Sequence, residues 1–156
     1  MDSKLSHKSI ANVQTRVHPQ CIVCSSGNAR GLHLDFHIEA DGSAVAEFSC
    51  ETEFEGYPGV LHGGVITSIL DGAMGNCIFA RGRAAVTVEM TTRFRHPVYT
   101  NQQACVRASM VRHSHPLYLM EAEIFQGESL KASAKGKFYD KPDLAEKIDL
   151  SGNRKP

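Results

Sequence analysis

The sequence has 156 residues, 42% of them hydrophobic, and 17 Lys and Arg balance 17 Asp and Glu. This length predicts one domain with its own core. The zero formal charge excludes the basic footprint of a nucleic-acid binder or a polybasic membrane anchor, and no apolar run approaches the ~20 residues of a membrane span. The five cysteines are odd in number and scattered, and the first 20 residues hold no apolar leader, so we expect a cytoplasmic protein without a disulfide framework.

The first part of the chain contains an arm, a hairpin, a loop and a helix, in that order. Residues 1–20 are polar and weakly patterned, and we interpret them as an N-terminal arm. Residues 31–49 alternate apolar and polar side chains around an Asp41–Gly42 turn, which predicts a β-hairpin, and a loop rich in Gly and Pro follows. Over residues 63–81 apolar residues recur at steps of three and four, which predicts a helix ending near Gly82.

The rest of the chain favours strands with short connections. We predict them over residues 85–94, 103–112, 118–126 and 130–139, and we expect residues 142–156 to form a flexible tail. The predicted fold class is α+β, with about six antiparallel strands covered on one face by one long helix, in a domain that spans residues 21–141. One helix cannot cover both faces of such a sheet, which predicts oligomerisation.

The segment before the helix is the first candidate for chemistry. His62-Gly63-Gly64 places two poor helix formers at the helix start. The first amides of a helix have no internal partner and lie at the positive end of its dipole, so they favour a carbonyl oxygen that becomes an oxyanion. A tight turn capped by His62 is the alternative interpretation.

Asp71 is the second candidate, because it is the only charged residue between Val65 and Ala80. A carboxylate near an apolar core carries a desolvation cost, which favours a base or nucleophile. A solvated outer face, or a cap to a neighbouring loop, is the alternative interpretation. Gly63 and Asp71 are eight residues apart in sequence, so they differ in height by about 12 Å along one helix. Both cannot reach one reacting centre from the same chain, and the pattern therefore predicts a homodimer with composite sites.

These residues carry a resemblance to a known family. His62-Gly63-Gly64, with Asp71 nine residues after His62, resembles the hotdog-fold acyl-CoA thioesterase superfamily, and within it the PaaI-like, 4-hydroxybenzoyl-CoA thioesterase type group. The resemblance covers residues 20–141. It extends to Phe54-Glu55-Gly56-Tyr57-Pro58-Gly59-Val60-Leu61 and to Cys21-Ile22-Val23-Cys24 running on to Arg30-Gly31-Leu32.

The resemblance implies a hotdog fold, in which the sheet wraps around the helix, and hydrolysis of an acyl-CoA thioester at a dimer interface. The Gly63 amide, helped by Gly64, would polarise the carbonyl, and His62 would support that geometry. Asp71 would activate water or attack the carbonyl carbon, and Thr87 matches the position of a Ser or Thr that assists the acid. Coenzyme A enters only as part of the substrate, so no cofactor is expected, and dimers are expected to pair into a tetramer.

The chain departs from the family pattern at one position. Several relatives carry an Asn or Gln just upstream of the His, whereas this chain has Glu55, and an ionised carboxylate donates no hydrogen bond. That difference keeps a second hypothesis open, a module that binds acyl-CoA or an acyl carrier without turnover; a hotdog dehydratase is a weaker third. The sequence itself offers further candidates for substrate contact: the pocket residues Met74 and Phe79 and, for the CoA phosphates, Arg93 and Arg95. A solvated strand face is the alternative interpretation of the two arginines.

A Cys-x-x-Cys pair offers a competing interpretation. Cys21 and Cys24, with His18 nearby, are possible zinc ligands, and a zinc-dependent interaction module is the last alternative. No second Cys pair accompanies them, and no helix start in a βαβ context favours redox chemistry. We therefore interpret them as ordinary thiols and expect no metal.

Overall fold

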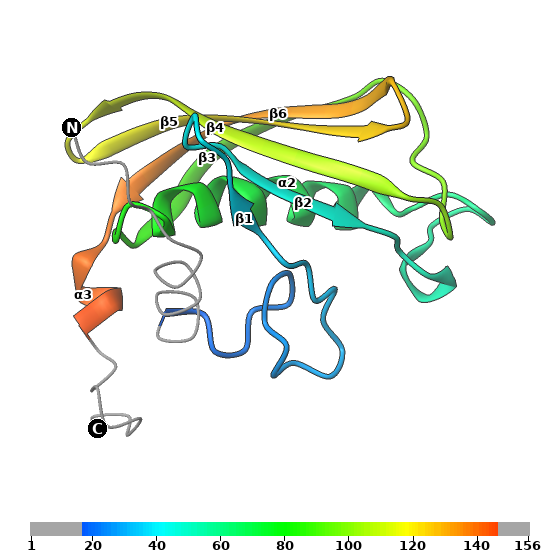
Figure 1. Ribbon diagram of the computed structural model, residues 1–156, viewed down its shortest axis with the longest axis horizontal. Helices are drawn as coiled ribbons and strands as arrows, with labels where there is room; N and C mark the ends of the chain where they lie inside the picture. Colours follow the sequence, from blue (N-terminus) through cyan, green and yellow to red (C-terminus); the bar gives the residue numbers. More distant parts are fainter. Residues whose placement is uncertain (1–16, 147–156) are drawn as a thin grey trace.

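The computed structural model describes residues 17–146, which form one antiparallel sheet packed on one long helix (Figure 1). The strands are β1 (His37–Ile38), β2 (Ala44–Phe48), β3 (Ala85–Phe94), β4 (Ala104–Ser114), β5 (Leu117–Gln126) and β6 (Ser129–Asp140). The helical elements are η1 (Thr52–Phe54), α2 (Gly63–Phe79) and α3 (Pro142–Glu146). The six-stranded antiparallel sheet confirms the predicted α+β class, and the helix and later strands start and end close to their predicted bounds.

The strand order is β1-β2-β4-β5-β6-β3, which places β3 at one edge of the sheet. Tight turns join β4 to β5 and β5 to β6, and Gly127 takes a φ of 57° between the last two. The connection that follows β3 instead crosses to β4, which is not its neighbour in the sheet, and the sheet partner of β3 is β6. The strand directly after α2 is therefore an edge strand, and its side chains are largely exposed.

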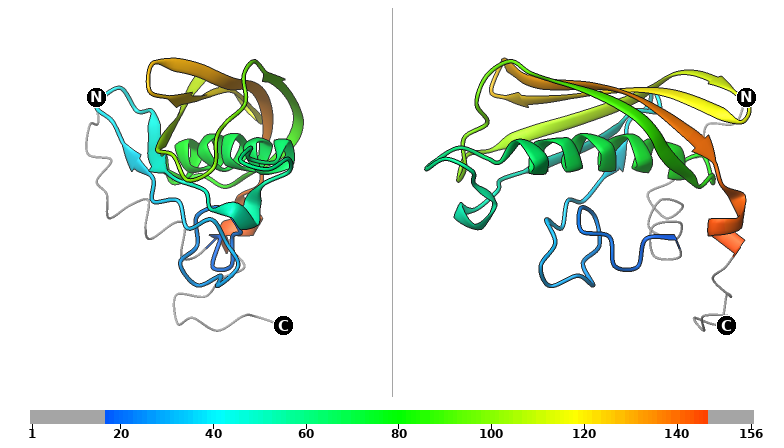
Figure 2. Two further views of the ribbon diagram at one scale, coloured as in Figure 1. Left: turned by 90° about the vertical axis from the view of Figure 1, so that its right-hand side faces the viewer. Right: turned by 180° about the vertical axis from the view of Figure 1, so that it is seen from behind.

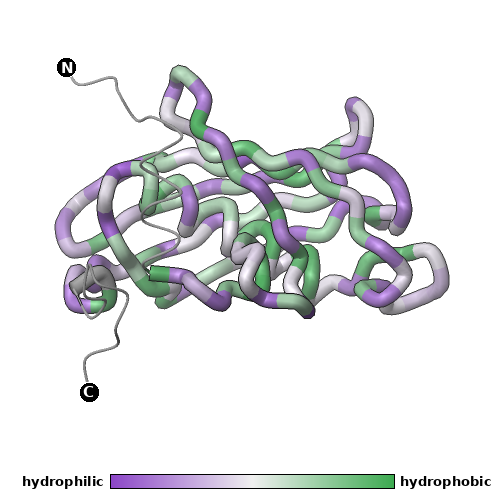
Figure 3. The backbone as a smooth tube through the Cα atoms, turned by 60° about the horizontal axis from the view of Figure 1, so that its bottom comes forward, coloured by the Kyte–Doolittle hydropathy of each residue, from purple (hydrophilic) through white to green (hydrophobic). Residues whose placement is uncertain are grey.

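The core lies between the concave face of the sheet and helix α2. Side chains of α2 such as Ile69, Leu70 and Met74 are fully buried, and they meet the alternating inward residues of the strands. Figure 2 (left) shows the sheet curving around the helix. In the hydropathy view, apolar and polar colours alternate along the strands, as half-buried strands require (Figure 3).

The N-terminal part of the predicted hairpin differs from the sequence prediction. Residues 31–36 are not a strand, and β1 contains only His37 and Ile38. The alternating burial is nevertheless present, because Leu34 is buried and Asp35 exposed. The physical reason is a different backbone partner: the amides of Leu32 and Leu34 donate to the carbonyls of Ile22 and Val23. This segment runs beneath α2, on the side away from the sheet (Figure 1).

The predicted chain ends are only partly described. Most of the arm, residues 1–20, lies outside the described residues. The predicted tail begins with the short helix α3, and its remainder, residues 147–156, is again outside them. Within residues 17–146 no helix has both the length and the apolar character that a membrane crossing needs. The cytoplasmic location stays a prediction.

Candidate active site

Helix α2 begins with a cap formed by its own sequence. His62 has an extended backbone, φ −61° and ψ 136°, and its Nδ1 accepts a hydrogen bond of 2.9 Å from the Gly64 amide. An accepting Nδ1 carries no proton, so the neutral ring holds its proton on Nε2. The cap engages the Gly64 amide and leaves the Gly63 amide, at the first helical position, without a partner inside the helix.

Close packing around His62 explains two of the nearby glycines. A Cβ on Gly64 would lie 3.1 Å from His62 Nδ1, and one on Gly56 would lie 3.3 Å from His62 Cδ2. A side chain at either position would press on the imidazole. Gly63 is different, because a Cβ there would meet only the Phe94 ring at an ordinary 3.6 Å. The glycines at 56 and 64 therefore position the cap, and Gly63 keeps the backbone beside Phe94 open.

A cavity of about 410 Å³ lies at this end of the helix. His62 and Gly63 line it together with loop residues such as Tyr57, with Phe94 at the end of β3 and with Arg95 just after that strand. The Leu61 amide donates to the Val98 carbonyl and brings the two loops together. The cavity thus combines apolar walls, a cationic side chain and the start of a helix.

Asp71 lies further along the same helix, and a residue of the sheet holds its side chain in place. Thr87 of β3 donates its hydroxyl to Asp71 Oδ1 at 2.5 Å. The register of β3 against β6 shifts just after Thr87, and such irregularities re-aim side chains. Burial raises the pKa of Asp71, while the Thr87 hydrogen bond opposes that rise. A half-buried carboxylate with a raised pKa is a stronger base than an exposed one.

A turn from the N-terminal segment faces Asp71. The charges of His18 and Cys21 act on the Asp71 pKa in opposite directions, His18 lowering it and Cys21 raising it. Within the turn, a hydrogen bond between the two thiols lowers the pKa of Cys21 and raises that of Cys24. The surroundings of Asp71 therefore include groups that the predicted thioesterase site did not.

The two candidate groups do not meet within one chain. Gly63 and Asp71 lie on one helix that runs from Gly63 to Phe79, so eight residues at 1.5 Å each separate them by about 12 Å. The structure brings Thr87 to Asp71 and Gly63 to His62, and it leaves these two pairs apart.

The predicted substrate contacts lie in different places. Arg95, just after β3, lines the cavity at the helix start, and Arg93 is exposed on β3 but does not line it. Met74 and Phe79 are fully buried, so they offer no surface to a ligand in this chain. Glu55 accepts hydrogen bonds from the Gly59 amide and the Thr100 hydroxyl, which organises the loop before His62.

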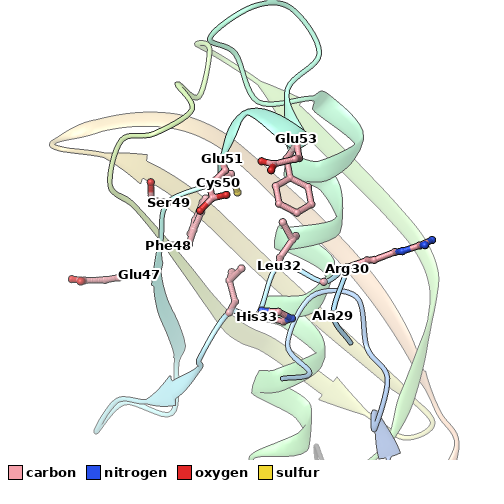
Figure 4. A pocket seen from close by; sticks show the side chains of 13 residues that line it. Ala29, Arg30, Leu32, His33, Glu47, Phe48, Ser49, Cys50, Glu51 and Glu53 are labelled. Atoms are coloured by element: carbon pink, nitrogen blue, oxygen red, sulfur yellow. The ribbon is translucent and has the colours of Figure 1, made fainter. Parts of the chain in front are cut away.

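A larger cavity lies elsewhere. About 620 Å³ opens between residues 29–34, the end of β2 and η1, and none of the predicted site residues lines it (Figure 4). Its wall carries Glu47, Glu51 and Glu53 against Arg30. A wall rich in carboxylates disfavours a ligand that carries phosphates, so size does not make this cavity the candidate site.

Some lining residues of the smaller cavity escaped sequence reasoning. From the sequence, His96 and Pro97 are interpreted only as the end of a strand, and Tyr57 only as part of a loop, but all three line the cavity. They reach the helix start because the chain pairs Val60 with Tyr99, far apart in sequence. No local pattern in the sequence predicts the pairing of Val60 with Tyr99.

Comparisons with known proteins agree with this architecture. Residues 58–133 match the family model described as the thioesterase superfamily. The predicted family resemblance is confirmed. No curated protein sequence gives a significant match to the chain.

Solved structures show that the fold is the hotdog fold. A crystal structure of a thioesterase superfamily protein superposes with a TM-score of 0.71 at 22% identity, over 74% of this chain but only 61% of that one. The E. coli PaaI protein from the phenylacetic acid degradation operon gives a TM-score of 0.70 at 20% identity, covering 83% of this chain and 94% of that one. A Streptococcus mutans protein bound to acetyl-CoA gives 0.65 at 17% identity, covering 78% and 91%.

Proposed function

We propose that this hotdog protein hydrolyses acyl-CoA thioesters to a free acid and CoA, at a site shared by two copies of the chain. The thioesterase-superfamily match over residues 58–133 supports the activity, and the acetyl-CoA bound to the similar Streptococcus mutans protein supports the substrate class. The observation that carries the proposal is the hydrogen bond by which Thr87 positions the half-buried Asp71 carboxylate.

The chemistry divides between the two parts of helix α2. The thioester carbonyl oxygen would accept a hydrogen bond from the Gly63 amide, where the helix dipole favours developing negative charge. The Asp71 carboxylate would take a proton from water while the water oxygen adds to the carbonyl carbon. The intermediate then expels the CoA sulfur, which receives the proton held by Asp71. In the alternative route Asp71 attacks the carbonyl carbon itself, CoA leaves, and water hydrolyses the acyl-aspartyl anhydride.

A second copy of the chain completes the site in this proposal. Strand β3 carries Thr87 and forms a sheet edge, and a long exposed edge invites pairing with another strand. An antiparallel copy would bring its own Gly63 amide toward Asp71 across the roughly 12 Å that separates the two groups in one chain. The dimer, and its pairing into a tetramer, are predictions that light scattering of the purified protein tests.

The cavity at the start of α2 would hold the part of the substrate next to the carbonyl. Phe94 is 54% exposed there and offers an apolar surface, and Arg95 adds positive charge at the rim. Arg93 lies two residues earlier, near the end of β3, and we propose that both guanidinium groups approach the CoA phosphates.

The first experiment measures thiol release from short, medium, long and aryl acyl-CoAs. Release that disappears in Asp71→Asn, with the folded state unchanged by circular dichroism, supports the proposal. Undiminished release by Asp71→Asn overturns the assignment of Asp71.

Mixing two inactive variants tests the shared site directly. Asp71→Asn supplies an intact Gly63 amide, and Gly63→Pro supplies an intact Asp71. If each site draws on both copies, random mixing after mild dissociation restores about a quarter of the wild-type rate, because half the dimers are mixed and each has one intact site. A mixture as inactive as its components, with mixed dimers shown to form, places both groups of a site on one chain.

One observation favours a second function, a module that binds acyl-CoA without turnover. Glu55 stands where, by the family resemblance, several relatives carry an Asn or Gln. Its Oε2 accepts hydrogen bonds from the Gly59 amide and the Thr100 hydroxyl instead of donating one. A rise in melting temperature with acyl-CoA, without release of CoA over the whole panel, would establish this alternative.

A further inference from the structure

A cluster of metal-ligating side chains lies outside the catalytic groups. His18, Cys21 and Cys24 each bring one ligand atom within 4.8 Å of the other two, and all three side chains are half-buried. In a tetrahedral zinc site, bonds of about 2.3 Å to sulfur and 2.0 Å to nitrogen place ligand atoms about 3.5–3.8 Å apart. Small side-chain rotations would bring the three atoms to that spacing.

One ring nitrogen of His18 makes no hydrogen bond. Within residues 17–146, His18 Nδ1 is buried and has no hydrogen-bond partner. Buried polar atoms are almost always satisfied, and each exception needs an explanation. A metal ion bound beside the two sulfurs would provide one, because a neutral imidazole nitrogen is a common metal ligand.

The backbone around the cluster is held in place. The Val23 amide donates to Cys21 Sγ at 3.4 Å, so a backbone donor already faces one sulfur. The carbonyls of Ile22 and Val23 accept hydrogen bonds from the amides of the segment that follows. The Phe79 ring packs edge-on against the His18 ring, with the two ring centroids 4.6 Å apart. Second contacts of this kind fix the orientation of metal ligands.

The cluster is attached to helix α2. The Val23 side chain packs so closely against Gly72 that a Cβ on Gly72 would lie 2.6 Å from it. Gly72 directly follows Asp71, so the turn sits beside the proposed base, on the side of α2 away from the sheet (Figure 1).

We propose that His18, Cys21 and Cys24 bind one Zn²⁺ ion per chain. Two thiolates and an imidazole form a donor set that suits zinc, whereas Mg²⁺ and Ca²⁺ prefer oxygen ligands. No fourth His, Cys, Asp or Glu joins the group among residues 17–146. The fourth position is therefore left to water, and a cavity of about 280 Å³ that His18 and Cys21 line gives it room.

Bound zinc would cross-link the two ends of the turn over residues 18–24. It would thereby keep this turn packed against α2. The expected consequence is greater stability of the folded chain, because a ligand that binds only the folded state stabilises it by mass action. The inference does not depend on hydrolysis, since it is read from metal content and stability alone.

The test begins with the full-length protein, purified with its thiols reduced, stripped by a chelator and titrated with Zn²⁺ alone. We expect about one zinc per chain after gel filtration, by elemental analysis, and a rise in melting temperature. Cys24→Ser should weaken binding at least about a hundredfold, since it removes one of three ligands. Cys105→Ser is the matched control, because it removes a half-buried thiol from strand β4 and should bind zinc like the wild type.

Titration of the unmutated protein with Co²⁺ keeps the test independent of how the variants fold. A thiolate-to-cobalt charge-transfer band with intense visible bands of a tetrahedral ion supports the site. Zinc content near zero in the reduced wild type, with no such bands, overturns the proposal. Zinc retained equally by Cys24→Ser, or a Cys21–Cys24 disulfide that persists under the reducing conditions of the titration, overturns it as well.

Discussion

The two halves of the proposed active site are built in different ways. At the start of α2, His62 caps the Gly64 amide two residues away, so neighbours in the sequence make this half. In the middle of the helix, Asp71 is held by Thr87, 16 residues later and on another element. The first half depends on local backbone geometry, and the second depends on the sheet closing over the helix. Substitutions should therefore affect the two halves in different ways.

The largest effect is expected where the reacting group itself is changed. Asp71→Asn keeps the size of the side chain but removes the base, so kcat should fall by about a hundred- to ten-thousandfold. Thiol release under saturating acyl-CoA measures the change. Asp35→Asn serves as the control, because Asp35 is exposed in the N-terminal segment, and it should leave kcat unchanged. A fall of less than about threefold in Asp71→Asn would show that this half is structural.

The helix start allows a backbone donor to be removed by substitution. Proline is tolerated at the first helical position, and the extended backbone of His62, φ −61° and ψ 136°, is the conformation that a following proline requires. Gly63→Pro should therefore preserve the helix and lower kcat by about a hundred- to a thousandfold, because the amide is lost. Gly63→Ala keeps the amide and should retain most of the activity. Equal rates for these two variants would contradict the role of the amide.

Thr87 tests the half that tertiary contacts build. Thr87→Val keeps the shape of the side chain but removes a hydrogen bond that lowers the Asp71 pKa, so that pKa should rise further. The base must be ionised, so the acid limb of the kcat–pH profile should move to higher pH. The maximal rate should fall by about tenfold, the cost of one hydrogen bond to a charged group. Thr87→Ser should restore the wild-type profile; an unshifted acid limb in Thr87→Val would separate Thr87 from the base.

The smallest effect concerns stability. Burial raises the pKa of Asp71 above its ordinary 3.8, so the folded chain holds this proton more tightly than the unfolded chain does. Stability therefore falls as pH rises from about 3.8 through the folded pKa, and at neutral pH the carboxylate is destabilising. Asp71→Asn should then melt at a higher temperature than the wild type at pH 7, and the difference should vanish below pH 3.8. Melting curves across that range measure it, and a less stable variant at pH 7 would show that hydrogen bonding outweighs burial.

The sequence by itself determined the secondary structure and the local half of the site. The change of period at residue 63, the Gly82 stop and the alternation of the later strands identified helix α2 and strands β3–β6. The His62 cap was also predictable, because a helix start is formed by residues within one turn of one another. The segment at 31–36 showed the limit: its alternation predicted the burial correctly, but its backbone partner proved to be the turn at Ile22 and Val23 instead of a strand.

Only the tertiary structure decided which distant residues meet. It placed Phe94 and Arg95 beside Gly63, buried Met74 and Phe79 completely, and turned Glu55 toward Gly59 and Thr100. It also brought ligand atoms of His18, Cys21 and Cys24 within 4.8 Å of one another, whereas the sequence alone left open whether they are zinc ligands or ordinary thiols. The physical reason is that periodicity records which face of an element is buried, whereas the partner on that face depends on how the whole sheet packs around the helix.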